Sequence, residues 1–565
     1  MTAESIEKEI KEEPALASTP LSIQNKYHHE ELPSGRLALL SIGLLTGLFL
    51  SFLDSSIVAT SIFSIGTDFD DMTMVNWVAL AYTLSYLGCA VLLARISDII
   101  GRRNAFVISY IIFIGFSIGC GFAQSLQQLI AFRALQGIGG SGLYSINMIT
   151  LPEIAPARFL QVFAALIGIV ITLSSVLGPV LGGVLTHYAS WRWVFWVNGP
   201  IGAISLLLFL MVWPKPQYLP NLERRSWGEL DYLGSTLLIA ATVLVVFPFQ
   251  NAGGATDSWG QTIFLAPLII GLIAFSGVFA WSIFVDKRWG DRIAAALPMS
   301  LLRNRIYALA ALNTMFLGFP YILIIYAFPL RSQIVNGKDA LVAGIMLLPM
   351  LGASAIGSAV SGKVNGTKDR SCETLVAATG FIVIGCGLLT TVSGSVDLEP
   401  KALGFLVFVG LGFGLSASTT TMLATLQSSI RDHAPAQGIA AQVRIFGGSL
   451  GIAASSAILQ TTLQAQVKGS ITPQQISSAA AGVSNLDSED IAAIRRAYAD
   501  AFRQDMQVCT IIGGIALLWA LGTYSRKRLG RAERREQQVE QENERRKVAA
   551  ADCARQQENS TKQAV

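Results

Sequence analysis

The chain has 565 residues, of which 52% are hydrophobic and only 14% are charged, and its formal net charge is +4. Typical soluble proteins carry about 25% charged residues, so this composition excludes an ordinary soluble enzyme. The small net charge gives no indication of nucleic-acid binding. We therefore expect an integral membrane protein.

Apolar runs of about 20 residues recur between clusters of charge, and each is long enough to cross a bilayer as a helix. Strand-like alternation is absent, so the protein is predicted to be all-α. The first six predicted spans are 37–62, 75–94, 105–123, 126–151, 159–185 and 193–213. Two more follow at 232–249 and 262–285. The last six are 306–330, 341–361, 374–392, 402–424, 438–463 and 508–523.

These fourteen spans divide the chain into five parts. Residues 1–36 form a polar tail without the apolar core of a signal peptide. Residues 37–213 are predicted to form a six-helix bundle, residues 214–305 two additional helices with their loops, and residues 306–525 a second six-helix bundle. Residues 526–565 are charged throughout, which predicts a solvated helix or a disordered tail.

An even number of spans places both termini on one side of the membrane. Lys and Arg are concentrated in the short loops on that side, as at Arg102, Arg103, Arg224 and Arg225. Because basic loops stay in the cytoplasm, both termini are predicted to be cytoplasmic. The longer connection 464–507 weakens this contrast without reversing it, and its polar residues from Ser484 predict the start of a short amphipathic helix.

Asp54 lies in the outer third of the first predicted span. An ionised carboxylate there costs about 2.5–3.5 kcal/mol, and removal from water favours the protonated form, which makes Asp54 a candidate proton carrier. The alternative is a helix-end aspartate that reaches interfacial water. Arg133 lies at matching depth in the fourth span, since both are about 10–12 Å below the outer surface at ~1.5 Å per residue. The two are predicted to form an ion pair or a proton relay, unless Arg133 extends to the surface.

The connection between the second and third spans contains Asp98, Gly101, Arg102 and Arg103. Gly101 permits a tight turn. One prediction is that Asp98 and the two arginines form a cytoplasmic gate, which joins helix ends and breaks when the protein changes shape. The other is that these charges only anchor the topology.

Glycines in the fourth and fifth spans predict close helix packing. Pro179, after Gly178, lacks an N–H and bends a helix, and Gly182 and Gly183 let a neighbouring helix approach. Residues 137–142 match the dinucleotide pattern GxGxxG. No strand precedes this pattern, so helix packing is the better interpretation.

Polar and aromatic residues in the spans are candidates for lining a substrate cavity, namely Gln136, Asn313, Tyr321, Tyr326 and Arg444. Aromatic residues in such positions often only pack against their neighbours. Arg444 is predicted either to meet an anionic substrate or to extend to the cytoplasm. The six cysteines show no zinc or disulfide spacing, so no metal site is expected.

Several segments resemble signatures of the major facilitator superfamily. Residues 98–103 are similar to its signature between the second and third spans, and residues 133–137 resemble its fourth-span motif linked with proton transfer. Residues 178–183 resemble its antiporter motif. Residues 53–58 and 191–200 resemble signatures of the fourteen-span drug:proton antiporter family of fungi.

This resemblance implies two six-helix bundles that rock against each other, with two extra helices between them. It implies proton-coupled efflux of bulky, largely apolar small molecules, such as fungal secondary metabolites, toxins or drugs. The expected partners are the substrate, protons and membrane lipid, without nucleic acid and with no cofactor beyond the proton gradient. The alternatives are a siderophore or basic amino-acid transporter, and a receptor or scaffold that transports nothing. We expect the plasma membrane, with the vacuolar membrane as the alternative.

Overall fold

The structure is a computed structural model. It describes residues 32–71, 74–75, 77–154, 160–214, 226–252, 260–289, 292–338, 340–365, 369–395, 397, 399–429, 432–466 and 488–525, together with 533, 534, 537, 538, 540, 541 and 544. The regular structure in these residues is helical, apart from one isolated parallel bridge between Leu230 and Ala294. Helices satisfy their own backbone hydrogen bonds, which is what a lipid environment requires.

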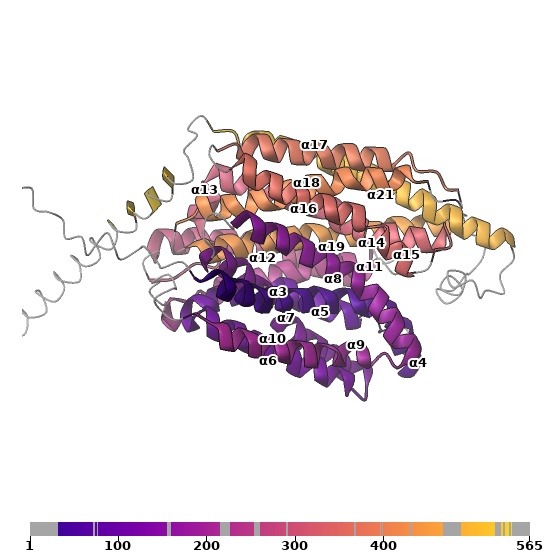
Figure 1. Ribbon diagram of the computed structural model, residues 1–565, viewed down its shortest axis with the longest axis horizontal. Coiled ribbons are helices and arrows are strands. Elements are labelled where there is room, and N and C mark those ends of the chain that lie inside the picture. Colours follow the sequence, from indigo (N-terminus) through magenta and orange to yellow (C-terminus); the bar gives the residue numbers. More distant parts are fainter. Residues whose placement is uncertain are drawn as a thin grey trace, which may run out of the picture.

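The N-terminal half contains six long helices, which Figure 1 shows gathered on one side of the molecule. Its core is a cluster of buried side chains that includes Leu44, Tyr110, Phe113 and Phe209. Three short helices, η2 (Val58–Thr60), α4 (Ile62–Asp68) and α9 (Trp193–Trp196), accompany the long ones. The long helices are α3 (Ser34–Ile57), α5 (Trp77–Ile100), α6 (Arg102–Gly121), α7 (Leu126–Ile154), α8 (Leu160–Tyr188) and α10 (Asn198–Val212).

The C-terminal half lies on the other side in Figure 1 and has a core of its own, which includes Ile324, Phe328, Ile382 and Leu406. One of its predicted spans is divided into two helices, α15 (Ala340–Ile345) and α16 (Leu348–Val364). The other helices are α14 (Arg305–Ile334), α17 (Ser371–Leu389), α18 (Lys401–Leu426), α19 (His433–Gln466) and α21 (Ser488–Gly522).

Two additional helices, α11 (Tyr232–Ala252) and α12 (Thr262–Arg288), follow the N-terminal half, flanked by η4 (Trp227–Glu229) and α13 (Met299–Arg303). Helix α11 packs against α5 of one half and α19 of the other. Asp231 fixes the beginning of α11, because its buried carboxylate accepts hydrogen bonds from Gly234 N, Trp281 Nε1 and Ala296 N. The additional pair therefore connects the two halves.

Twelve helices among the described residues are long and apolar enough to cross a membrane. The all-α integral membrane architecture is confirmed. The two predicted spans outside this set are α7 and α8, so fourteen crossings stay a prediction.

The last helix differs from its prediction. The predicted amphipathic helix and the predicted span 508–523 form one continuous helix, α21, which begins at Ser488 and is 35 residues long. At ~1.5 Å per residue this is about 52 Å, more than the ~30 Å of a hydrocarbon core. Packing against α14, α17 and α19 stabilises the polar first part, and Glu489 and Asp490 complement the positive helix N-terminus.

Candidate functional site

A buried ion pair occupies the interior of the N-terminal half. Asp54, near the end of α3, and Arg133, on α7, both have an exposed fraction of 0%. Arg133 Nη1 pairs with Asp54 Oδ2. The structure therefore brings the two predicted residues together, and Arg133 does not extend to the surface.

The second carboxylate oxygen of Asp54 binds two amides. Asp54 Oδ1 accepts a hydrogen bond of 2.9 Å from Gln136 Nε2 and one of 2.8 Å from Asn198 Nδ2. Asn198 also donates to Ser117 Oγ at 3.0 Å, and Gln136 Oε1 accepts from Arg133 Nη1 at 2.8 Å. The amide groups that donate to Asp54 bind an ionised carboxylate more strongly than a neutral one. Protonation of Asp54 would therefore weaken contacts from α7 and α10 at the same time.

Arg133 has contacts that do not depend on Asp54. Its Nε donates to the carbonyl oxygen of Val78 at 3.0 Å. Its Cζ atom lies 4.3 Å from the centre of the Tyr82 ring and 5.5 Å from that of Phe195, where a guanidinium is attracted by the ring face. These contacts can hold the guanidinium in place independently of Asp54.

Two amides of this network differ from the sequence interpretation. Gln136 was a candidate for the substrate cavity, but it bonds to Asp54 and Arg133 instead. Asn198 was not identified individually, although it lies in the signature segment 191–200. The usable signal was its polarity inside an apolar segment, because a buried amide must find a hydrogen-bond partner.

The predicted gate residues lie where α5, α6 and α7 end or begin. Gly101 has a φ of 87°, which glycine adopts without strain. Arg102 pairs with Asp98 at 2.7 Å and bonds twice to Glu153 at 2.9 and 3.1 Å. Arg103 is exposed and forms no ion pair with a described residue, so its place in the gate stays a prediction. Adjacent residues on a helix point about 100° apart, which turns Arg103 away from Arg102.

A second contact, missed from sequence, joins the two halves. Arg95 on α5 is 2% exposed, and its Nη2 lies 4.0 Å from Oδ1 of Asp432, directly before α19. Gln442 on α19 donates to the carbonyl oxygen of Leu87 at 3.1 Å. The ion pairs of Arg102 and the approach of Arg95 to Asp432 thus meet near the C-terminal end of α5, whereas Gln442 contacts the middle of that helix.

The glycines of the antiporter motif face α3. A Cβ at Gly178 would overlap Ser56 Oγ, and one at Gly182 would overlap the carbonyl oxygen of Ile57. Gly183 has no neighbouring atom within 4 Å of such a Cβ, so it takes no part in this contact. Helix α8 is continuous through Pro179.

The other cavity candidates lie apart from one another. Asn313 is buried within the C-terminal half, where it donates to α17 and α21, and Tyr326 is 43% exposed. Tyr321 stacks on Phe413 with ring centres 3.4 Å apart. Arg444 Cζ lies 5.9 Å from that same Phe413 ring. Only Tyr321 and Arg444 therefore share a neighbour.

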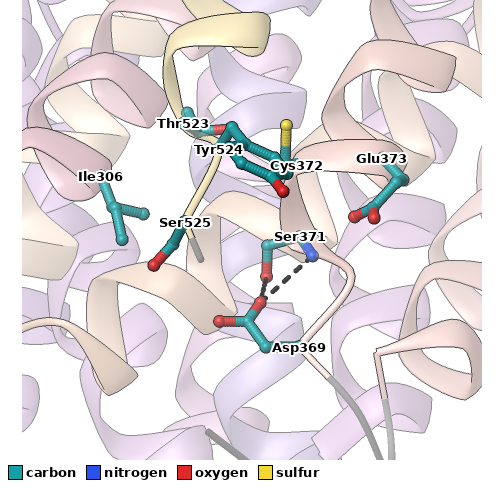
Figure 2. A pocket seen from close by; sticks show the side chains of 8 residues that line it. All are labelled: Ile306, Asp369, Ser371, Cys372, Glu373, Thr523, Tyr524 and Ser525. Atoms are coloured by element: carbon teal, nitrogen blue, oxygen red, sulfur yellow. Dashed lines mark hydrogen bonds between the residues drawn. The ribbon is translucent and has the colours of Figure 1, made fainter. Parts of the chain in front are cut away.

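A crevice at the ends of α14, α17 and α21 is shown in Figure 2. Its volume of about 10 Å³ admits at most one water molecule, so cargo cannot enter. It is lined by Ile306, Asp369, Ser371, Cys372, Glu373, Thr523, Tyr524 and Ser525.

Two residues of the charged tail contact the helices. Arg534 donates to Asp369 Oδ2 at 3.1 Å, and Gln538 donates to carbonyl oxygens at the end of α18. Arg534 and Gln538 thus attach this part of the tail to the helices, while the other described tail residues are exposed.

Sequence comparison identifies the family. The Major Facilitator Superfamily profile matches residues 44–456. The chain belongs to this superfamily. Members of the superfamily are transporters, so the protein is a small-molecule transporter and not an enzyme. No cluster of His, Cys, Asp or Glu side chains in the described ranges could hold a metal ion.

Several superfamily members are similar over most of their length. The MFS-type transporter FPY5 of Fusarium mangiferae is 31% identical over 508 residues, covering 88% of this chain and 84% of that protein. Multidrug resistance protein 3 of Bacillus subtilis (strain 168) is 30% identical over 412 residues, with coverages of 73% and 77%. The aspyridones efflux protein of Neocamarosporium betae is 28% identical over 439 residues, 76% of each chain.

Solved structures of the superfamily share the fold. An inward-facing bacterial homologue of the human lysosomal transporter Spinster has a TM-score of 0.53 and 14% identity, covering 88% of this chain and all (100%) of that one. A double-tryptophan mutant of XylE also has a TM-score of 0.53, with 13% identity and coverages of 90% and 99%. At this identity the likeness concerns the fold alone.

Proposed function

We propose that the protein exports bulky, largely apolar small molecules in exchange for protons. The observation that carries this proposal is the buried network of Asp54, Arg133, Gln136 and Asn198. A carboxylate inside a membrane protein usually marks an ion or proton pathway. The printed names of two similar proteins, a multidrug resistance protein and an efflux protein, support export as the direction.

The mechanism begins with proton binding to Asp54. A neutral carboxyl group loses its attraction for Arg133, and the bonds from Gln136 and Asn198 weaken. Because these donors belong to α7 and α10 whereas Asp54 belongs to α3, the change loosens three helices of the N-terminal half. Proton binding thereby favours a different arrangement of this half, and the change in arrangement alternates the side of the membrane from which the cargo site is accessible.

The test is Asp54→Asn in sealed proteoliposomes loaded with a fluorescent drug. We expect a pH gradient to drive export by the wild type and to drive none by the variant, since an amide neither gains nor releases a proton in this range. The control is Asp68→Asn, which removes a carboxylate paired at the surface with Arg192 and should leave coupling intact. Export that responds to pH equally in wild type and Asp54→Asn would contradict the proposal.

The proposal includes the environment of the protein. Both tails lie in the cytoplasm, the membrane is the plasma membrane, and the energy comes from the proton gradient without a cofactor. Lipid surrounds the helices, and no nucleic acid takes part. Helix α3 begins and α21 ends at the same end of the molecule (Figure 1), which supports tails on a common side. Protease protection of tags at the two termini in sealed cells measures this orientation.

The alternatives receive less support from the site. A basic amino acid would need a carboxylate other than Asp54, which is already bound to Arg133 and to two amides. A receptor without transport would have no need of a proton-binding group in the membrane.

A further inference from the structure

Arg444 lies far from either end of its helix. It is on α19, which begins at His433, so the start of the helix is about 16 Å away at ~1.5 Å per residue. Its exposed fraction is 9%. The sequence left open whether Arg444 extends to the cytoplasm, and this depth places the end of the helix beyond the reach of its side chain.

The charge of Arg444 has no counter-charge among the residues that the structure describes. Of the other buried arginines in the described residues, Arg133 pairs with Asp54, Arg95 lies 3.9 Å from a carboxylate oxygen of its own helix, and Arg331 donates to Asn336 and Ser393. Arg444 forms no ion pair with a described residue, and its Nε has no hydrogen-bond partner. A buried cation is costly unless an anion pairs with it.

Aromatic side chains from both halves surround this cation. Tyr144, on α7 of the N-terminal half, interacts with the Arg444 guanidinium, and the centre of the Phe413 ring, on α18, lies 5.9 Å from Arg444 Cζ. The Tyr144 ring is 5.9 Å from Tyr86 and 5.6 Å from Phe52. A positive charge therefore lies beside an aromatic wall, at the boundary between the two halves.

We propose that Arg444 selects a cargo that is an organic anion, with a carboxylate or an acidic hydroxyl group attached to an aromatic body. The anionic group supplies the counter-charge that Arg444 lacks, and its rings pack against Tyr144, Tyr86 and Phe413. A small inorganic anion would leave the aromatic wall unused. This inference rests on the proposed function, because it names the cargo of the same transporter.

The charge of the cargo has an electrical consequence. When an anion leaves while a proton enters, both movements carry positive charge inward, so a membrane potential that is negative inside drives the exchange. A neutral cargo would move only the charge of the proton. Export of an anion should therefore respond to the potential more strongly than export of a neutral compound.

The test compares two dyes that share a xanthene body, the anion fluorescein and the cation rhodamine 123. In proteoliposomes we expect the wild type to export fluorescein faster. Arg444→Gln should slow fluorescein export about tenfold or more, the effect of losing one charge-assisted hydrogen bond, without slowing rhodamine 123. Arg444→Lys keeps the charge and should retain part of the fluorescein export. Arg331→Gln, the control, removes another buried arginine and should leave the ratio of the two rates unchanged.

Fluorescein binding to the purified protein, measured as a rise in thermal stability, separates cargo recognition from coupling. We expect Arg444→Gln to lose this stabilisation, and Asp54→Asn to keep it while losing pH-driven export of both dyes. A wild type that prefers rhodamine 123, or Arg444→Gln and Arg444→Lys variants that lose both dyes equally, would overturn the inference. Fluorescein binding that depends on Arg444 without any pH-driven export would preserve the inference and refute the proposed proton coupling.

Discussion

Asp54 is held in the membrane interior by donors from two other helices. Its carboxylate has the guanidinium of Arg133 on one oxygen and the amides of Gln136 and Asn198 on the other. An ionised carboxylate without such donors would be expensive to bury. The strength of these hydrogen bonds and of the ion pair therefore sets how readily the Asp54 carboxylate can bind a proton instead.

For these residues, we predict the effect of Asn198→Ala on the pH dependence of export. The variant removes a hydrogen bond of 2.8 Å to the carboxylate, so a proton should bind at lower proton concentration. We expect the external-pH midpoint of export to rise by about one pH unit, as measured by dye efflux from proteoliposomes at a series of external pH values.

Glu399→Gln serves as the control for Asn198→Ala. Hydrogen bonds from Lys401 and Ser393 lower the pKa of Glu399 to about 2. Its carboxylate, in the connection between α17 and α18, thus stays ionised over an assay range of about pH 5 to 8, and its removal should leave the midpoint in place. An unchanged midpoint in Asn198→Ala would show that this amide does not influence proton binding.

At the scale of elements, glycines bring the helices of the N-terminal half close together. On α7, Gly137 and Gly140 face α5, whereas Gly139 and Gly142 face α6. A Cβ at these positions would meet backbone or side-chain atoms of the neighbouring helix. The GxGxxG segment is thus a packing surface, as its position in an apolar span predicted, and it holds α7 where Arg133 can reach α3.

The contact between α8 and α3 permits a matched pair of variants. Gly182→Ala places a methyl group against the carbonyl oxygen of Ile57, whereas Gly183→Ala enters open space. We expect Gly182→Ala to destabilise the protein by about 1–3 kcal/mol, as overpacking does, and to slow transport. Gly183→Ala should behave like the wild type. Thermal unfolding in detergent measures both, and equal stabilities would show that α8 can shift away from α3 at no cost.

In the whole molecule, each half has its own core, and the boundary between the halves includes polar contacts beside apolar packing. Arg95 approaches Asp432 across this boundary, and Gln442 bonds to the backbone of α5. Polar contacts of this kind can break and re-form without disrupting either core. The boundary is therefore where the two halves can move relative to each other.

Asp432→Asn should shift the balance between conformations. The substitution removes the charge opposite Arg95, and we expect the population with separated helix ends to rise about two- to fivefold. Spin labels attached to cysteines that replace Arg103 and Lys363, exposed residues of opposite halves, report this separation by pulsed electron paramagnetic resonance once the native cysteines are replaced. Asp286→Asn, which breaks a pair with Arg303 away from this contact, should leave the distances unchanged. The prediction is contradicted if both variants give the same distribution of label-to-label distances as the wild type.

The fold class and the chemistry that the site could contain follow from the order of the residues alone. Long apolar runs can only be helices in lipid, and an acid and a base at matching depth in two spans pointed to the pairing of Asp54 with Arg133. The turn at Gly101 was equally local, since a single residue type adopts that conformation readily.

The remaining contacts depend on how the helices pack together. Asn198 and Gln136 reach Asp54, Arg95 approaches Asp432, and Arg444 meets no counter-charge among the described residues, because the packing of helices distant in sequence fixes which side chains meet. The early start of α21 has the same cause, since its polar residues remain helical by packing against α14, α17 and α19. Hydropathy reports where a segment enters lipid, but it carries no information about which neighbour each side chain will face.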